Sequence, residues 1–207
     1  MSFSLAIKRL EPRFRIYLQM LDLKPTDSVL DLGCGDGLLI SQFKNYCTKI
    51  TGVDNSEESL KLAFKINPDA EFINEDIAKL DLPKKSYDVV YCFEVLQYIQ
   101  QQQLVLKKMM QLARRSVVFS VPDFDSFWGQ ITKLRQILFG VKEYPDSSVK
   151  QWFRKNQLKR WSNTQYMTHS LASRLQNGFQ GYLKYSLRRL LRYKLFIITR
   201  IDLQSSI

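Results

Sequence analysis

Val29-Leu30-Asp31-Leu32-Gly33-Cys34-Gly35-Asp36-Gly37 is the stretch that decides the fold of this 207-residue chain. A short apolar run ends in an acid and three alternate glycines, and a helical pattern follows directly, which predicts a strand, a tight turn and the start of a helix. Glycines let the backbone approach a flat ligand closely. A carboxylate at Asp31 disfavours a phosphate beside this turn and favours a cationic ligand.

Residues 31–37 resemble motif I of the class I S-adenosylmethionine (SAM) dependent methyltransferases. The resemblance implies SAM as the cofactor, and it implies that Asp31, Gly33, Cys34 and Gly35 bind it. Glycines in a turn between a strand and a helix are common by chance, so the following strands must supply independent support.

A second short strand, residues 49–54, ends in Asp54, roughly 20 residues beyond the glycines, where an acid can accept hydrogen bonds from both ribose hydroxyls. We include the next residue, Asn55, among the cofactor-binding residues. The alternative is that Asp54 caps the helix that follows, in which we expect Leu60, Ala63 and Phe64 to be buried. Ribose binding is favoured because strand, acid and spacing coincide.

A third strand, residues 71–77, ends in Asp76 and Ile77, which occupy positions that in the resembling family bind the adenine amino group and pack on the ring. The apolar run 86–92 reads as a strand buried on both faces. It continues into Phe93 and Glu94, which resemble motif IV of the small-molecule methyltransferases and are expected near the methionine part of SAM. No Asp/Asn-Pro-Pro-Tyr follows this strand, which disfavours methylation of a nucleobase.

Strand patterns alternate with helical patterns up to residue 122, which predicts an α/β fold. We expect a Rossmann-like, open, mostly parallel seven-stranded sheet with helices on both faces and a helical insertion after strand 5. Ligands of such sheets lie at the carboxyl ends of the strands. We therefore expect Asp31, Asp54, Asp76 and Glu94 to surround one ligand.

The chain is expected to form a single domain. Residues 1–122 would be the cofactor-binding core and begin with an amphipathic helix on which Phe14, Tyr17, Leu18 and Leu21 share one face. In the resembling family such a helix often covers the cofactor, which Arg13, Arg15 and Tyr17 could then face; a helix that serves packing alone is the favoured alternative. Residues 123–163, rich in aromatic side chains, would be an inserted acceptor or lid segment; an extra helix pair with ordinary core packing is an equal alternative. Residues 164–207 would supply the closing helices and strands.

Three elements are expected near the C-terminus from the resemblance to type 11 methyltransferases. They are a helix over residues 160–175, a sixth strand entered at residues 177–179, and a closing strand at residues 195–199.

The net charge of +11 is uneven, since residues 1–122 hold 16 Lys and Arg against 15 Asp and Glu, and residues 123–207 hold 15 against 5. This excess fits an anionic partner, and an Arg-rich amphipathic stretch at 183–192 could rest on an anionic membrane surface; a solvated basic face is an equal alternative. No signal peptide is recognised, so we expect a cytoplasmic protein, with peripheral contact at the inner membrane surface as a further option. Three widely spaced cysteines suggest no metal site.

Together these features predict a SAM-dependent methyltransferase that acts on a small-molecule or lipid-like acceptor, which can be anionic. The alternatives are an RNA methyltransferase that uses the basic C-terminal part, and a non-catalytic partner protein with this fold. His169, Glu94 and Tyr98 are candidate general bases, and the sequence does not choose among them. It also does not specify the acceptor, the methylated atom or the oligomeric state.

Overall fold

The structure is a computed structural model, and it describes residues 12–122, 163–168 and 196–203. The elements in these ranges are, in chain order, α2 (Pro12–Leu21), β1 (Ser28–Leu32), α3 (Leu38–Phe43), the 3-10 helix η1 (Lys44–Tyr46), β2 (Lys49–Asp54), α4 (Glu57–Ile66), β3 (Glu71–Asn74), β4 (Tyr87–Cys92), the 3-10 helix η2 (Leu96–Tyr98), α5 (Gln102–Leu112), β5 (Ala113–Pro122), β6 (Asn163–Thr168) and β7 (Phe196–Asp202).

The strands form one seven-stranded sheet in the order β3-β2-β1-β4-β5-β7-β6. Strands β1 to β5 are parallel, and β7 runs antiparallel to both β5 and β6. The strand order reverses between β1 and β4, and ligands of open α/β sheets bind outside the carboxyl ends of the strands at such a point. The predicted open, mostly parallel, seven-stranded sheet is confirmed, while the predicted helical insertion after strand 5 lies outside the described residues.

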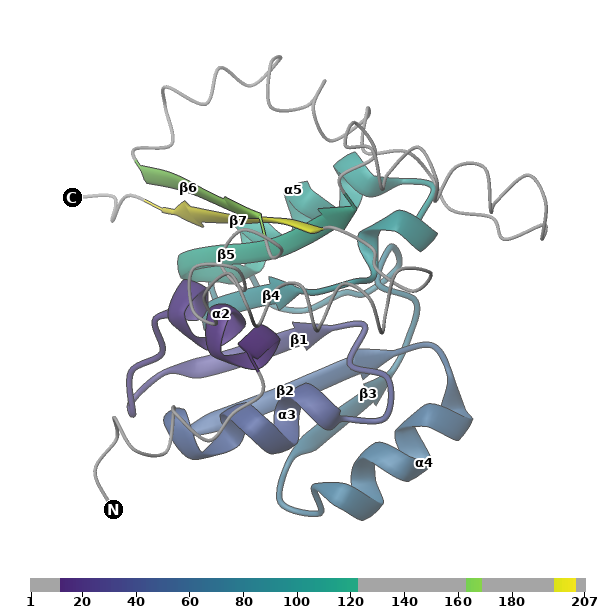
Figure 1. Cartoon of the computed structure of the whole chain (residues 1–207). Helices are drawn as coiled ribbons and strands as arrows, with labels where there is room; N and C mark the ends of the chain where they lie inside the picture. The colour runs from purple at the N-terminus through teal and green to yellow at the C-terminus, as the bar shows by residue number, and fades with distance from the viewer. Residues whose placement is uncertain (1–11, 123–162, 169–195, 204–207) are drawn as a thin grey trace, which may run out of the picture.

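Helices cover both faces of this sheet, as predicted (Figure 1). Successive residues of a strand point to opposite faces. Val29 and Tyr91 accordingly join the core cluster under α2 and α3, whereas Leu30 and Val90 join the cluster under α5. Each buried strand therefore contributes to two cores. None of the helices in the described part of the chain is long and apolar enough to span a membrane.

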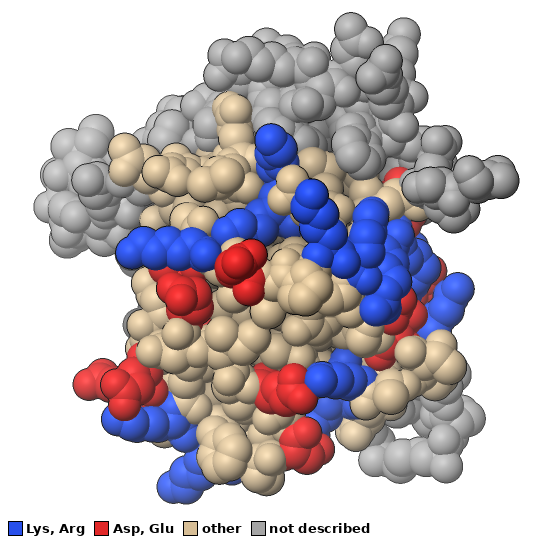
Figure 2. All heavy atoms as spheres, turned by 180° about the vertical axis from the view of Figure 1, so that it is seen from behind, with Lys and Arg blue, Asp and Glu red and all other residues tan. Residues whose placement is uncertain are grey.

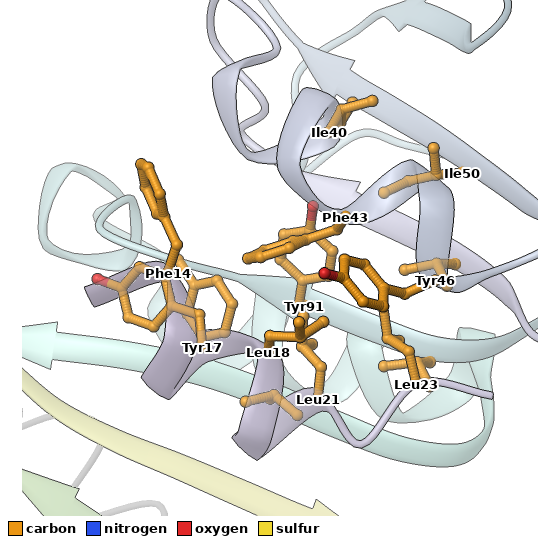
Figure 3. Close-up of a cluster of buried hydrophobic side chains, with 14 of the residues drawn as sticks. Phe14, Tyr17, Leu18, Leu21, Leu23, Ile40, Phe43, Tyr46, Ile50 and Tyr91 are labelled. Carbon is orange, nitrogen blue, oxygen red and sulfur yellow. The ribbon is translucent and has the colours of Figure 1, made fainter. Parts of the chain in front are cut away.

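The face of helix α2 that its spacing predicted is buried, namely Phe14, Tyr17, Leu18 and Leu21. Ile16 and Met20 are buried as well, so burial of this helix extends beyond the predicted face. Figure 3 shows the side chains of the predicted face opposite the aromatic residues that come from α3, η1 and β4. The helix thus covers the core on one face of the sheet.

The buried stripe of α4 differs from the prediction at one position. Leu60 and Ala63 are buried, but Phe64 is 59% exposed. Asn67, directly after the helix, takes the buried position instead, and its Nδ2 donates to the Gly37 carbonyl at 3.0 Å. The Asn67 amide therefore connects the end of α4 to the glycine turn.

The helix predicted over residues 160–175 is wrong at residues 163–168, which form strand β6. This segment pairs with β7 from Asn163↔Asp202 to Thr168↔Ile197. Its two threonines and one tyrosine favour a strand, and the partner strand satisfies its backbone groups. The closing strand expected at 195–199 is confirmed as β7, while the strand entry expected at 177–179 lies outside the described residues.

Candidate ligand site at the carboxyl ends of the strands

The turn after β1 is tied to the neighbouring strand β2. The backbone N–H groups of Gly33 and Cys34 both donate to the Val53 carbonyl, at 2.7 and 3.0 Å. Gly33, Gly35 and Gly37 have φ angles of +82°, +54° and +74°, a region that L side chains rarely adopt. The three alternate glycines are thus explained by backbone conformation.

The three glycines differ in what surrounds them. A Cβ on Gly33 would lie 2.4 Å from Val95, and one on Gly37 would lie 2.8 Å from the Asn67 amide. A Cβ on Gly35, in contrast, would meet no described atom within 4 Å. Gly33 and Gly37 therefore serve packing, and Gly35 is the position at which a ligand can lie against the backbone.

Asp54 lies at the end of β2, next to Gly35. Its Oδ2 accepts the Gly35 N–H and its Oδ1 accepts the Ser56 N–H, each at 2.9 Å. The capping residue of α4 is Ser56, whose Oγ accepts the Ser59 N–H at 3.2 Å, so the structure does not support the alternative in which Asp54 caps the helix. Each oxygen of a carboxylate can accept a second hydrogen bond, so half-exposed Asp54 can also accept from a ligand.

The exit of β3 is attached to Asp54 as well. The Asn74 side chain and the Glu75 N–H both donate to the Asp54 carbonyl at 3.1 Å. Strand β3 ends at Asn74, three residues earlier than predicted, so Asp76 and Ile77 lie in the turn that follows. Asp76 is exposed and accepts the backbone N–H of residue 78 on Oδ1, which leaves Oδ2 with no partner among the described residues.

Ile77 and Asn55 complete the part of the candidate site that β2 and β3 supply. The Ile77 side chain is 8% exposed and belongs to the core on the α5 face, so it offers only a small apolar surface at this edge. Asn55 is exposed directly after β2.

Phe93 and Glu94, the two residues predicted to lie near the methionine part of SAM, directly follow β4. Glu94 has a φ of +61°, its N–H donates to Ser120 Oγ at 2.7 Å, and its carbonyl accepts from the Gln97 amide at 2.7 Å. The Tyr17 hydroxyl donates to Glu94 Oε1 at 2.6 Å. Phe93 is buried and stacks on the Tyr17 ring, with centroids 4.1 Å apart.

Asp31 lies differently from the other three acids. Its side chain is 1% exposed on the α2 face of β1, where Oδ2 accepts the Tyr91 hydroxyl at 2.8 Å. Burial raises the pKa of Asp31 to about 7; the Tyr91 hydrogen bond lowers it, and the charge of Asp54 raises it further. The expectation that all four acids face one ligand is therefore corrected, because strand alternation turns the Asp31 carboxylate into the core.

Sequence reasoning missed two groups that hold these acids. Tyr91 is paired with Asp31 in the parallel register of β1 and β4, and Ser120 holds the Glu94 backbone. Ser120 is a polar residue within the apolar end of β5, and this was the signal in the sequence that could have indicated its role. Of the three base candidates, Tyr98 is 54% exposed, Glu94 lies in the site, and His169 lies outside the described residues.

Comparisons with known proteins agree with this architecture. Residues 23–189 match the sequence profile of a family described as a methyltransferase domain. An uncharacterized methyltransferase of Schizosaccharomyces pombe is 31% identical over 87 residues, which cover 41% of this chain and 34% of the relative. A trans-aconitate 2-methyltransferase of Enterobacter sp. (strain 638) is 31% identical over 108 residues, which cover 50% of this chain and 42% of the relative. The matches thus span well under half of either relative.

A solved structure from Mesorhizobium loti, described as an S-adenosylmethionine dependent methyltransferase, superimposes with a TM-score of 0.66. Its sequence is 18% identical, and the match covers 95% of this chain and all of the other. The resemblance to the class I methyltransferases drawn from residues 31–37 is confirmed, and the chain belongs to the methyltransferase domain family.

Proposed function

We propose that this protein is a SAM-dependent methyltransferase that transfers a methyl group to a small-molecule or lipid-like acceptor. The observation that carries the proposal is the pairing of Gly35, which leaves open space where a side chain would stand, with the Asp54 carboxylate that its N–H holds at 2.9 Å. A flat nucleoside needs a stretch of backbone with no side chain in its way, and its ribose needs a carboxylate that accepts hydrogen bonds. The residues present therefore fit the cofactor.

The other predicted residues have roles that follow from their places. The backbone of Gly33 and Cys34 shapes the turn. Asp76, with one carboxylate oxygen that has no partner among the described residues, would accept a hydrogen bond from the adenine amino group, and Ile77 would pack on the ring. Phe93 and Glu94, at the end of the next strand, would contact the methionine part.

When bound, SAM supplies a methyl group on a positively charged sulfur, and the protein has to align the acceptor in line with that methyl and exclude water. The carboxylates at this edge of the sheet favour a cation over a phosphate. Asp54 and Asp76 place negative charge beside the turn, and Glu94 adds a third carboxylate at the exit of β4. This electrostatic balance supports SAM over a dinucleotide.

The acceptor class rests on the segment after β4. Residues 93–96 read Phe-Glu-Val-Leu and contain no Pro-Pro pair, so the arrangement typical of nucleobase methylation is missing from this place. The name of one relative specifies trans-aconitate, a small anionic acceptor. Both observations support a small molecule as the acceptor.

RNA is the second candidate acceptor, and positive charge on the surface favours it. Figure 2 shows Lys and Arg side chains gathered in a band across the face of the sheet that α5 covers. Lys79, Lys84, Lys85 and Lys107 are exposed on α5 and on the connection from β3 to β4. Binding through many phosphates would weaken steeply as salt rises, whereas binding of a small acceptor would change little, so a salt titration separates the two.

Calorimetry with SAM and its demethylated product, S-adenosylhomocysteine (SAH), tests the proposed function. The wild-type chain should bind both, and Asp54→Ala should lose roughly 2 kcal/mol or more of binding free energy, because a charge-assisted contact to the ribose is removed. Asp81→Ala is the matched control, since this exposed acid lies in the connection after the adenine-binding turn. Equal affinities of Asp54→Ala and the wild type would refute the ribose assignment.

A further inference from the structure

Tyr17 is a side chain of helix α2 that reaches the candidate site. Its hydroxyl donates to the Glu94 carboxylate at 2.6 Å, across 77 positions in the sequence. Its ring lies nearly parallel to that of Phe93, with an interplanar angle of 10°, and the side chain is only 1% exposed. Packing therefore fixes the ring, and the fixed ring fixes the direction in which the hydroxyl donates.

Glu94 is held from several sides at once. The left-handed backbone conformation is unusual for a residue with a side chain, and such a conformation persists where its surroundings determine it. Here Ser120 binds the N–H and Gln97 binds the carbonyl, and both of these side chains are buried. The backbone contacts place the Glu94 side chain at the strand exit, and Tyr17 then sets the orientation of its carboxylate.

We propose that Tyr17 is a positioning residue of the ligand site, which acts through Glu94 on the amino-acid part of SAM. This inference rests on the proposed function. Glu94 is half-buried, so part of its side chain remains accessible to a ligand. Each oxygen of a carboxylate can accept more than one hydrogen bond, so Glu94 can accept the Tyr17 hydroxyl and also bind the ammonium group of the amino-acid part.

A purely structural role is the competing explanation, because a buried tyrosine hydroxyl needs a hydrogen-bond partner wherever it lies. Five other apolar residues of α2 already provide the packing of this helix in the core: Phe14, Ile16, Leu18, Met20 and Leu21. The two explanations differ in which ligands they affect. A structural defect would weaken every ligand of the site, whereas a positioning defect would weaken only ligands that carry the amino-acid part.

Calorimetry on the full chain with three ligands separates these explanations. SAM and SAH both carry the amino-acid part, and 5′-methylthioadenosine lacks it. We expect Glu94→Gln to weaken SAM and SAH by about tenfold or more. Tyr17→Phe, which keeps the stacked ring and removes the hydroxyl, should weaken both by about three- to tenfold. Neither variant should change the affinity for 5′-methylthioadenosine.

Tyr46→Phe is the matched control. Tyr46 belongs to the same core cluster as Tyr17, is 9% exposed, and lies in η1, away from the exit of β4 (Figure 3). Loss of its hydroxyl should leave the affinities for all three ligands unchanged. Ser120→Ala offers an independent route, because it removes the acceptor of the Glu94 N–H, and it should give the same pattern across the three ligands as Tyr17→Phe.

The possible results point in clear directions. Unchanged SAM affinity in Tyr17→Phe, or an equal loss for 5′-methylthioadenosine, would overturn the positioning role and leave the proposed function intact. A wild-type chain that binds none of the three ligands would remove the proposed function, and the positioning role with it. Selective loss of SAM and SAH in both Tyr17→Phe and Ser120→Ala supports the inference.

Discussion

The buried acid Asp31 should make the stability of this protein fall as pH rises through neutrality. Its carboxyl has a pKa of about 7 in the folded chain against an ordinary value of 3.8, chiefly because burial disfavours the charged form. The folded state therefore holds one proton more than the unfolded state between these two pH values. Stability from this group is fully present below pH 3.8, falls as pH rises, and is lost above pH 7.

The size of the effect follows from the two pKa values. Between pH 5 and pH 8 the linkage relation gives a loss of about 2.5 kcal/mol in the free energy of unfolding from Asp31 alone. Asn in place of Asp cannot ionise and keeps an oxygen that can accept the Tyr91 hydroxyl. Asp31→Asn should therefore remove this part of the pH dependence. The free energy of unfolding of the variant minus that of wild type should be larger at pH 8 than at pH 5.

Urea unfolding of both chains at pH 5, 6, 7 and 8 measures this difference directly. Asp81→Asn, an exposed acid, serves as the control and should follow the wild-type curve. If wild type and Asp31→Asn lose stability in parallel from pH 5 to pH 8, the carboxyl is not protonated in the folded core, and the reasoning from burial fails.

Two further predictions concern the turn and its ligand. Gly35→Ala should weaken SAM binding by about tenfold or more and cost only about 1 kcal/mol of stability, because the added methyl meets no described atom but occupies the space proposed for the ligand. Gly33→Ala must displace Val95, so its loss of stability in urea unfolding should exceed its loss of SAM binding free energy. The affinity for SAM, measured by calorimetry from pH 6 to pH 8, should rise with pH because a bound cation favours the ionised form of Asp31. The rise should be absent in Asp31→Asn, and it should be smaller for SAH, which lacks the sulfonium charge.

Much of the sheet was predictable because its information is local. Each parallel strand is a short apolar run, and the acids that follow β2 and β4, Asp54 and Glu94, lie where the runs end. The alternation of strand and helix patterns then implies that these ends meet at one edge. No long-range contact was needed for these predictions.

The orientation of Asp31 and the position of β6 depend on contacts that a single sequence does not display. Asp31 lies opposite Tyr91 only because β1 and β4 pair in one register, and the two residues are 60 positions apart. Strand β6 was predicted as a helix because the expectation came from the order of elements in similar proteins and not from the residues 163–168 themselves. Pairing with β7 decides their conformation.

Two sets of acids in the described part of the chain are held in different ways. Outside the site, Asp27, Asp69 and Asp88 form ion pairs with Arg115, Lys44 and Arg114. By contrast, the partners found in the described part of the chain are neutral for Asp54 and Asp76 at the site and for Asp31 in the core: backbone N–H groups hold Asp54 and Asp76, and the Tyr91 hydroxyl holds Asp31.

A neutral donor fixes a carboxylate without cancelling its charge, whereas an ion pair does both. Backbone N–H groups satisfy the hydrogen-bonding needs of Asp54 and Asp76. They do not neutralise the negative charge of these two carboxylates at the edge of the sheet. Among the described residues, no ion pair therefore offsets the charge of Asp54 and Asp76 beside the open turn at Gly35. A ligand that brings positive charge lowers this electrostatic cost, and a phosphate-bearing ligand raises it, so the mode of attachment of the acids itself favours a sulfonium cofactor.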